Sequence, residues 1–266
     1  MPQESNGFQG LTSLWGLPTE ARVREVVQWG GVWMAVTDSK GLAAIIPYPQ
    51  GDSRKWGLEV GGNPHAAELL PNGNIAVAAS TGGWIRVYAS SQGPDDGTYA
   101  EYGLPGAHAV LWDLERKTLW AAGSFDIVEL AVEGTDAEPV LTERMKAQLP
   151  TKHAHDVQSV AGSPDKLWVA TGSKVYQYSK STGKFDLSYE GSAGISRVGV
   201  KSVGSLPDGR VVETVTDTAK TPPGPCTANN WCTDTIDFFQ PDGSRSERRI
   251  QDSELYKARV LNPGYE

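Results

Sequence analysis

The chain has 266 residues, of which 39% are hydrophobic and 21% are charged, as in soluble globular proteins. Its net charge of -8 argues against a nucleic-acid partner, because phosphate binding needs clustered Lys and Arg. No run approaches the roughly 20 apolar residues of a membrane-spanning helix, so we expect no membrane partner, and we expect a monomer.

The N-terminal part of the chain contains short β-rich runs. Residues 32–60 read as three strands separated by turns, and ARVREVVQWGG at 21–31 is a further strand candidate. The start, MPQESNGFQG, lacks the charged and apolar regions of a signal peptide. We therefore expect an extracellular protein whose signal has been removed, with a cytoplasmic protein as the alternative.

Four similar units follow along the chain. They begin with HAAELLPNGNIAVAAS at His65, HAVLWDLERKTLWAAGS at His108, HDVQSVAGSPDKLWVATGS at His155 and KSVGSLPDGRVVETV at Lys201. Each unit reads as three short strands, and a fourth, outer strand fits residues 98–105, 140–150, 185–191 and 244–252. A repeat of roughly 40–50 residues with four strands predicts a β-propeller blade.

The last unit is lengthened by the segment PGPCTANNWCTD, which holds the two cysteines of the chain, Cys226 and Cys232. Their spacing is compatible with a small disulfide-closed loop or with two free thiols. A structural zinc site is disfavoured, because it normally needs four Cys or His ligands and no second pair lies nearby.

The C-terminal run KARVLNPG at 257–264 is similar to the first strands of the preceding units. We predict that it pairs with the N-terminal segment and closes a ring, which satisfies both strand edges. The result is one all-β domain over residues 1–266, a five-bladed β-propeller. If residues 21–31 form an inner strand, six blades are the alternative. The expected blades are 1–63 with 256–266, 64–106, 107–153, 154–197 and 198–255.

The first strand of each propeller blade lines the central channel, so equivalent residues of different blades meet there. The residues that open these strands are His65, His108, His155, Lys201 and Lys257. Three of the four histidines in the chain thus fall on one structural position, which a random distribution would rarely produce. We predict a functional ring of imidazoles and ammonium groups, with a structural channel plug as the alternative.

Other polar residues are expected near this ring. Glu68 and Asp156 follow it in sequence and could orient imidazoles or bind a metal, unless strand alternation turns them into the blade packing. Tyr256, directly before Lys257, could act as a general acid or only pack. His153 could reach the channel mouth from its connecting loop.

Imidazoles and ammonium groups suit an anionic ligand even in an acidic protein, because local charge outweighs net charge for a small ligand. One chemistry is β-elimination at a uronate, in which a His or Lys base removes the C5 proton and Tyr256 or a histidine protonates the leaving oxygen. We therefore predict catalytic roles for the five ring residues and Tyr256. Alternatively, His65, His108 and His155 hold a divalent metal ion in the channel. A glycosidase is disfavoured, because the ring positions carry no carboxylate pair.

The strings NPHAAELLPNGNIAVAAS, HAVLWDLERKTLWAAGS and LWVATGSKVYQYS resemble a family of WD-like single-domain propellers. Among characterised proteins they are most similar to propeller-type polysaccharide lyases, including the rhamnosyl-glucuronate lyases, over most of residues 30–262. The resemblance implies cleavage of an acidic oligo- or polysaccharide, with His65, His108 and His155 as catalytic or metal-binding groups. The chain is shorter than most propeller lyases, which commonly have more blades.

The competing class is a non-catalytic propeller that binds sugars or proteins. Aromatic residues such as Trp84, Tyr99, Tyr102 and Trp231 would form its binding face. A lectin built from repeats is expected to repeat its binding residues on the blade surfaces. Here the repeated polar residues indicate one axial site, which favours an enzyme.

Overall fold

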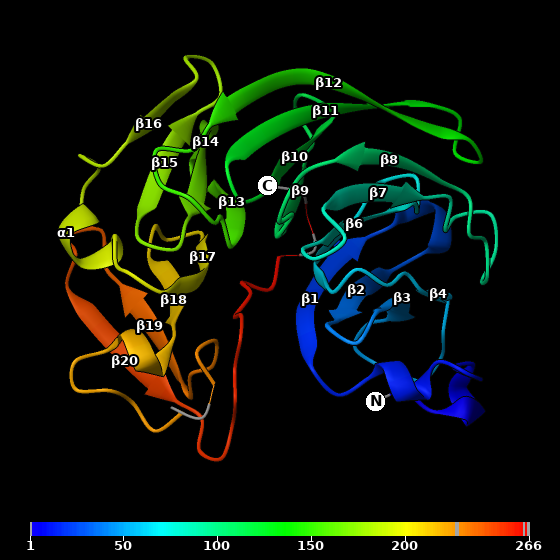
Figure 1. The fold of residues 1–266 in the computed structure, drawn as a ribbon, viewed down its shortest axis with the longest axis horizontal. Helices are drawn as coiled ribbons and strands as arrows, with labels where there is room; N and C mark the ends of the chain where they lie inside the picture. The colour runs from blue at the N-terminus through cyan, green and yellow to red at the C-terminus, as the bar shows by residue number, and fades with distance from the viewer. Residues whose placement is uncertain (1, 227–228, 263, 265–266) are drawn as a thin grey trace. The chain divides into compact units, whose positions relative to one another are not determined.

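The computed structural model describes residues 2–226, 229–262 and 264. These residues form five antiparallel sheets of four strands each, and neighbouring strands in a sheet are consecutive in the chain (Figure 1). Each sheet is a propeller blade, so the predicted fold class, an all-β, five-bladed β-propeller, is confirmed. In the described part of the chain, no helix is long and apolar enough to cross a membrane.

The blades belong to two compact units, which are described separately. Unit 1 comprises Met1–Ala147 with Leu261–Tyr265, and unit 2 is built from Gln148–Val260.

Unit 1 contains three blades. Their strands are β1 (Pro18–Glu25), β2 (Val32–Asp38), β3 (Leu42–Pro47) and β4 (Trp56–Glu59); β5 (Pro64–Leu69), β6 (Ile75–Ala79), β7 (Trp84–Tyr88) and β8 (Tyr99–Gly103); and β9 (Ala109–Asp113), β10 (Thr118–Ala122), β11 (Asp126–Gly134) and β12 (Pro139–Gln148). Short 3₁₀ turns lie at η1 (Glu4–Asn6), η2 (Thr12–Leu14) and η3 (Val27–Trp29).

Unit 2 contains two blades. Their strands are β13 (Asp156–Val160), β14 (Ser163–Ala170), β15 (Val175–Ser179) and β16 (Lys184–Asp186), followed by β17 (Val200–Ser205), β18 (Val211–Val215), β19 (Thr235–Phe239) and β20 (Arg245–Arg249). One helical turn, α1 (Ser192–Ile195), joins the two blades, and η4 (Asp217–Ala219) follows β18.

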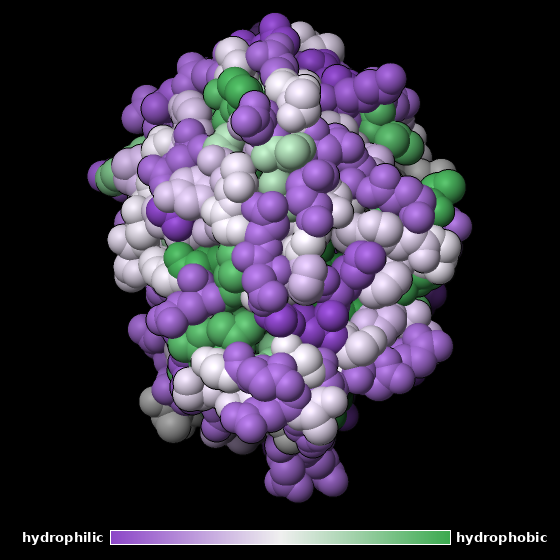
Figure 2. Space-filling view, turned by 90° about the vertical axis from the view of Figure 1, so that its right-hand side faces the viewer, coloured by the Kyte–Doolittle hydropathy of each residue, from purple (hydrophilic) through white to green (hydrophobic). Residues whose placement is uncertain are grey.

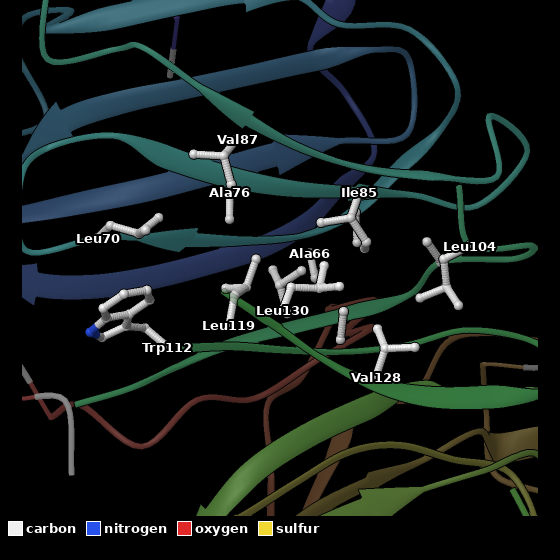
Figure 3. Packing of buried hydrophobic residues seen from close by; sticks show 14 residues of the cluster. Ala66, Leu70, Ala76, Ile85, Val87, Leu104, Trp112, Leu119, Val128 and Leu130 are labelled. Carbon is white, nitrogen blue, oxygen red and sulfur yellow. The ribbon is translucent and has the colours of Figure 1, made fainter. Parts of the chain in front are cut away.

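Side-chain size explains how the blades pack. The second strands β6 (IAVAA) and β10 (TLWAA) are buried at every position, whereas the outer strand β8 (YAEYG) alternates between exposed and half-buried residues. Alanines on the central strands leave room for the larger side chains of the next blade, and Leu119 and Val128 belong to the same buried cluster as Ala76 and Ile85 of the preceding blade (Figure 3). The blade faces therefore form the core of the unit.

The predicted outer strands are confirmed. The expected ranges 98–105 and 244–252 contain β8 and β20, the range 140–150 covers all of β12 except Pro139, and the range 185–191 overlaps β16 only at residues 185–186. Residues 32–60 form the second, third and fourth strands of the first blade, also as expected.

The predicted closure by the C-terminal strand was wrong. The inner strand of the first blade is β1, which pairs with β2 along its whole length, so the chain's own N-terminal residues fill that position. Because residues 257–262 form no strand, the candidate at 21–31 adds no sixth blade. Instead, Arg24 of β1 donates hydrogen bonds to the carbonyls of Asn262 and Gly264, both at 3.0 Å. Pro263 of the expected strand lies outside the described residues.

Candidate functional site

The residue at the start of each inner strand lies outside the regular pairing between that strand and the second strand of its blade. Thr19, His65 and Lys201 each lie at a β-bulge, because the register shifts at these residues. His108 and His155 directly precede β9 and β13. We call these five the strand-start residues. A bulge leaves its residue outside the regular pairing and redirects the side chain, as is common next to active sites.

Thr19, and not Lys257, is the strand-start residue of the first blade, so that part of the prediction was wrong. The Thr19 hydroxyl is buried, donates to the carbonyl oxygen of Pro64 at 2.7 Å and lies 2.9 Å from the Thr37 hydroxyl. This position is structural in the first blade, because the Thr19 hydroxyl hydrogen-bonds β1 to residues of β2 and β5.

In unit 2 the structure brings two of the predicted residues into contact. Lys201 Nζ lies 3.0 Å from His155 Nε2, and both side chains are half-buried. Burial lowers the pKa of Lys201 to about 8. A fraction of Lys201 is therefore neutral near neutral pH, and the pair can both accept and return a proton.

In unit 1 the structure brings together the other two histidines of the predicted ring. The ring centroids of His65 and His108 are 4.3 Å apart, with an angle of 44° between the planes. His108 Nδ1 lies 2.8 Å from the carbonyl oxygen of Gly106. Since a carbonyl oxygen only accepts, Nδ1 carries the proton in this contact. In a neutral His108, Nε2 is then the acceptor nitrogen.

The two carboxylates expected beside the ring belong to buried ion pairs. Glu68 is fully buried and accepts hydrogen bonds from Arg22 and Arg24 of β1. Asp156 accepts two hydrogen bonds from Arg259, at 2.6 and 3.0 Å, and one from the Val203 amide. Strand alternation turns both carboxylates into the packing, so their role is structural.

The remaining candidates lie on the chain segments beside these strands. Tyr256 is buried, and its ring packs edge-on against Trp231 with centroids 6.4 Å apart. Lys257 Nζ lies 5.5 Å from the centroid of the Tyr256 ring. His153 is exposed on the loop before β13 and has a positive φ of 64°. Burial of Tyr256 disfavours its predicted role as a general acid.

A second buried titratable group, Glu213 of β18, was not singled out from the sequence. Arg197 Nη2 bridges its carboxylate at 2.8 Å and that of Asp237 at 2.7 Å. Burial raises the pKa of Glu213 to about 8, although Arg197 opposes the shift. Asp237 also accepts hydrogen bonds from Arg245 Nε and Nη2, at 3.0 and 2.8 Å. Burial is the dominant influence on Glu213, which therefore keeps its proton at neutral pH.

This proton makes stability depend on pH. Between about pH 4.5 and 8 the native state holds a proton on Glu213 that the unfolded chain has released, so raising the pH favours unfolding. We expect the free energy of unfolding to fall across this range by at most about 1.4 kcal/mol per pH unit from this group. Urea denaturation of Glu213→Gln should show a flatter profile than wild type, whereas the exposed control Glu190→Gln should not. An unchanged slope in Glu213→Gln would contradict the assignment.

The contacts of the three predicted metal-binding histidines are not equally suited to a metal ion. His155 Nε2 is occupied by Lys201, whose positive charge opposes a nearby cation. The metal role stays a prediction for His65, His108 and His155. Among the described residues, Cys226, Cys232 and Glu254 also bring three potential ligand atoms together. The two sulfurs are joined in a disulfide, so they provide no thiolate ligands.

Some of the aromatic residues expected on the alternative binding face pack inside the protein instead. Trp84 is only 7% exposed, so its expected exposure was wrong. The Arg86 guanidinium lies 4.0 Å from the Trp84 ring centroid and 4.2 Å from that of Tyr99. Figure 2 shows a face where hydrophilic residues predominate and apolar residues form small, separate areas. A broad apolar docking area is absent from that face.

Family and fold comparisons give two results. Residues 21–221 match a family described as "Family of unknown function (DUF6528)". No curated protein matches the chain.

Two solved structures have a similar fold. A streptogramin B lyase has 16% sequence identity and a TM-score of 0.56, over 88% of this chain and 69% of that chain. A catalytically inactive virginiamycin B lyase variant from Staphylococcus aureus, in a structure with quinupristin, has 13% identity and a TM-score of 0.56, over 88% of this chain and 72% of that chain. At these identities the likeness shows the fold alone. Neither description names a rhamnosyl-glucuronate lyase, so that finer resemblance stays a prediction.

Proposed function

We propose that this chain, which belongs to the family of unknown function DUF6528, is a β-propeller lyase acting on an anionic, uronate-containing glycan. The observation that carries the proposal is the 3.0 Å contact between Lys201 Nζ and His155 Nε2. A half-buried amine of lowered pKa beside an imidazole has the properties of a base that removes a proton from carbon. The two lyases of similar fold support this reaction type.

The proposed reaction is a redox-neutral elimination. Lys201 takes the C5 proton of the uronate, and the electrons of the C5–H bond form a C4=C5 double bond. The C4–O bond breaks, and the leaving oxygen receives a proton from the Lys201–His155 pair. Lys257, a cation of the same unit, is the proposed group for binding the carboxylate, whose neutralisation acidifies the C5 proton.

Location outside the cell is part of the proposal. The disulfide between Cys226 and Cys232 supports it, because such bonds persist mainly in oxidising compartments.

The test is an assay of the purified chain on polygalacturonate, alginate, a glucuronan and a rhamnosyl-glucuronate polymer. We expect at least one polymer to give the ultraviolet absorbance of a double bond conjugated with a carboxylate. New reducing ends without this absorbance would indicate a hydrolase instead. Binding without cleavage would favour the non-catalytic propeller.

A further inference from the structure

The connection between the second and third strands is unusually long in the last blade. In unit 1 the corresponding connections are residues 39–41, 80–83 and 123–125, and in unit 2 the connection from β14 to β15 is 171–174. The connection from β18 to β19 covers residues 216–234 (Figure 1). We call residues 216–234 the insertion.

The insertion is anchored at its base. The buried carboxylate of Asp217 accepts hydrogen bonds from Lys220 Nζ at 2.6 Å, the Thr233 hydroxyl at 2.7 Å and the Cys226 amide at 2.8 Å. The disulfide between Cys226 and Cys232 closes the segment between them. These contacts join the two ends of the insertion to each other and fix the geometry of its base, as a binding wall requires.

A cleft of about 700 Å³ lies between the insertion and the sheet. Ala219 to Pro225 form one side, and Arg197, Val198, Val215, Asp234, Thr235, Arg245, Glu247 and Arg249 line the other. This volume falls in the range of ligand pockets. Val215 pairs with Val200, the residue before Lys201, so the cleft and Lys201 lie at the same end of the blade.

Two arginines give the cleft its binding chemistry. Arg197 and Lys220 pair with buried carboxylates, and their own side chains are only 24% and 17% exposed. Arg245 and Arg249 also pair with buried carboxylates, those of Asp237 and Asp234, but their side chains remain 42% and 58% exposed. Arg245 pairs with Glu247, which is itself 60% exposed, and such an exposed pair contributes little to stability. A ligand carboxylate can therefore replace Glu247. Arg249 uses Nε for Asp234, which leaves its terminal amino groups for a two-point contact with a carboxylate.

We propose that this cleft is a subsite that binds a second carboxylate of an acidic oligosaccharide through Arg245 and Arg249. The inference rests on the proposed function, because it assigns the cleft to sugar units beside the one that reacts. It adds that the substrate is an oligomer with carboxylates on neighbouring units. A single uronic acid has one carboxylate and could not occupy both the reaction site and the subsite.

The experiment measures binding of trigalacturonate by isothermal titration calorimetry. The full chain carries Lys201→Gln to prevent turnover, with or without Arg245→Gln and Arg249→Gln. We expect the two arginine substitutions to raise the dissociation constant at least about tenfold, because each removes a charge-assisted contact. Arg249→Lys, which keeps the charge but loses the two-point geometry, should give an intermediate value.

The matched control is Arg144→Gln, which removes an exposed arginine of β12 and should leave binding unchanged. Maltotriose, a neutral trimer, should bind at least about tenfold more weakly than trigalacturonate. Equal affinity with and without Arg245 and Arg249, or equal affinity for the neutral trimer, would overturn the subsite. If the wild-type chain cleaves a polymer by elimination but the arginine substitutions leave trigalacturonate binding unchanged, the subsite alone is refuted. Arginine-dependent binding without elimination would refute only the proposed function.

Discussion

A Lys201→Gln variant is expected to lose about 10²–10⁴-fold in the turnover rate of elimination, while KM changes little. Glutamine retains most of the length and polarity of lysine but cannot accept a proton at neutral pH. The loss therefore reports on proton transfer and not on packing. The measurement is the initial rate of double-bond formation on the polymer that the wild-type chain cleaves.

The pH profile separates a base from a structural lysine. Because the pKa of Lys201 is about 8, the wild-type rate should rise with pH up to about that value and then level off. Lys184→Gln, an exposed lysine of β16 in the same unit, should keep both rate and profile. A Lys201→Gln enzyme with wild-type turnover would remove Lys201 from the mechanism.

Glu68→Gln is expected to lower the free energy of unfolding by about 3–5 kcal/mol. Glu68 is 0% exposed and joins Arg22 and Arg24 of β1 to β5. Burial raises the pKa of Glu68, but the charges of Arg24 and Arg22 outweigh this effect and lower it. The carboxylate is therefore ionised at neutral pH. Its removal takes from the buried Arg22 and Arg24 the carboxylate that they share, and Glu20, 3.8 Å from Arg22, is the weaker counter-charge that Arg22 keeps.

Urea denaturation at neutral pH measures this effect, with Glu133→Gln as the matched control. Glu133 pairs with Arg144 where both side chains are about half-exposed, so its loss should cost no more than about 1 kcal/mol. The Glu68 contribution is present above the ordinary carboxyl pKa and is lost as pH falls through the lowered native value. Similar effects of the two substitutions would show that the buried pairs do not hold β1 to β5.

The repeat made most of the fold predictable, because every blade reuses the same strand and turn pattern. Turn-forming and β-rich residues marked β6, β10 and β14 directly in the sequence. β1 was harder to assign, since Arg22 and Arg24 resemble surface residues until Glu68 is known to face them. The C-terminal run copies the inner-strand pattern, but its backbone has other partners. The Ala258 amide donates to the Ser202 hydroxyl, and the Asn262 carbonyl accepts from Arg24.

The repeat also made part of the candidate site predictable. Alignment of repeats selected His65, His108, His155 and Lys201, and the structure joins them in two pairs, one within each unit. Which neighbour each side chain meets depends on bulges and side-chain angles that a repeat does not encode. Glu213 was missed because a glutamate on a strand shows no sign of burial in sequence. The unequal length of the last repeat did mark the insertion.

The bulges also bear on how such a chain changes over evolutionary time. Thr19, His65 and Lys201 occupy corresponding places with three different chemistries, while the strand pairs beside them keep their register. Because the backbone at a bulge lies outside the regular ladder, the fold accepts a structural hydroxyl at Thr19 and reactive groups at His65 and Lys201. Relatives with the same blades can for this reason acquire, alter or lose an activity by single substitutions at these places.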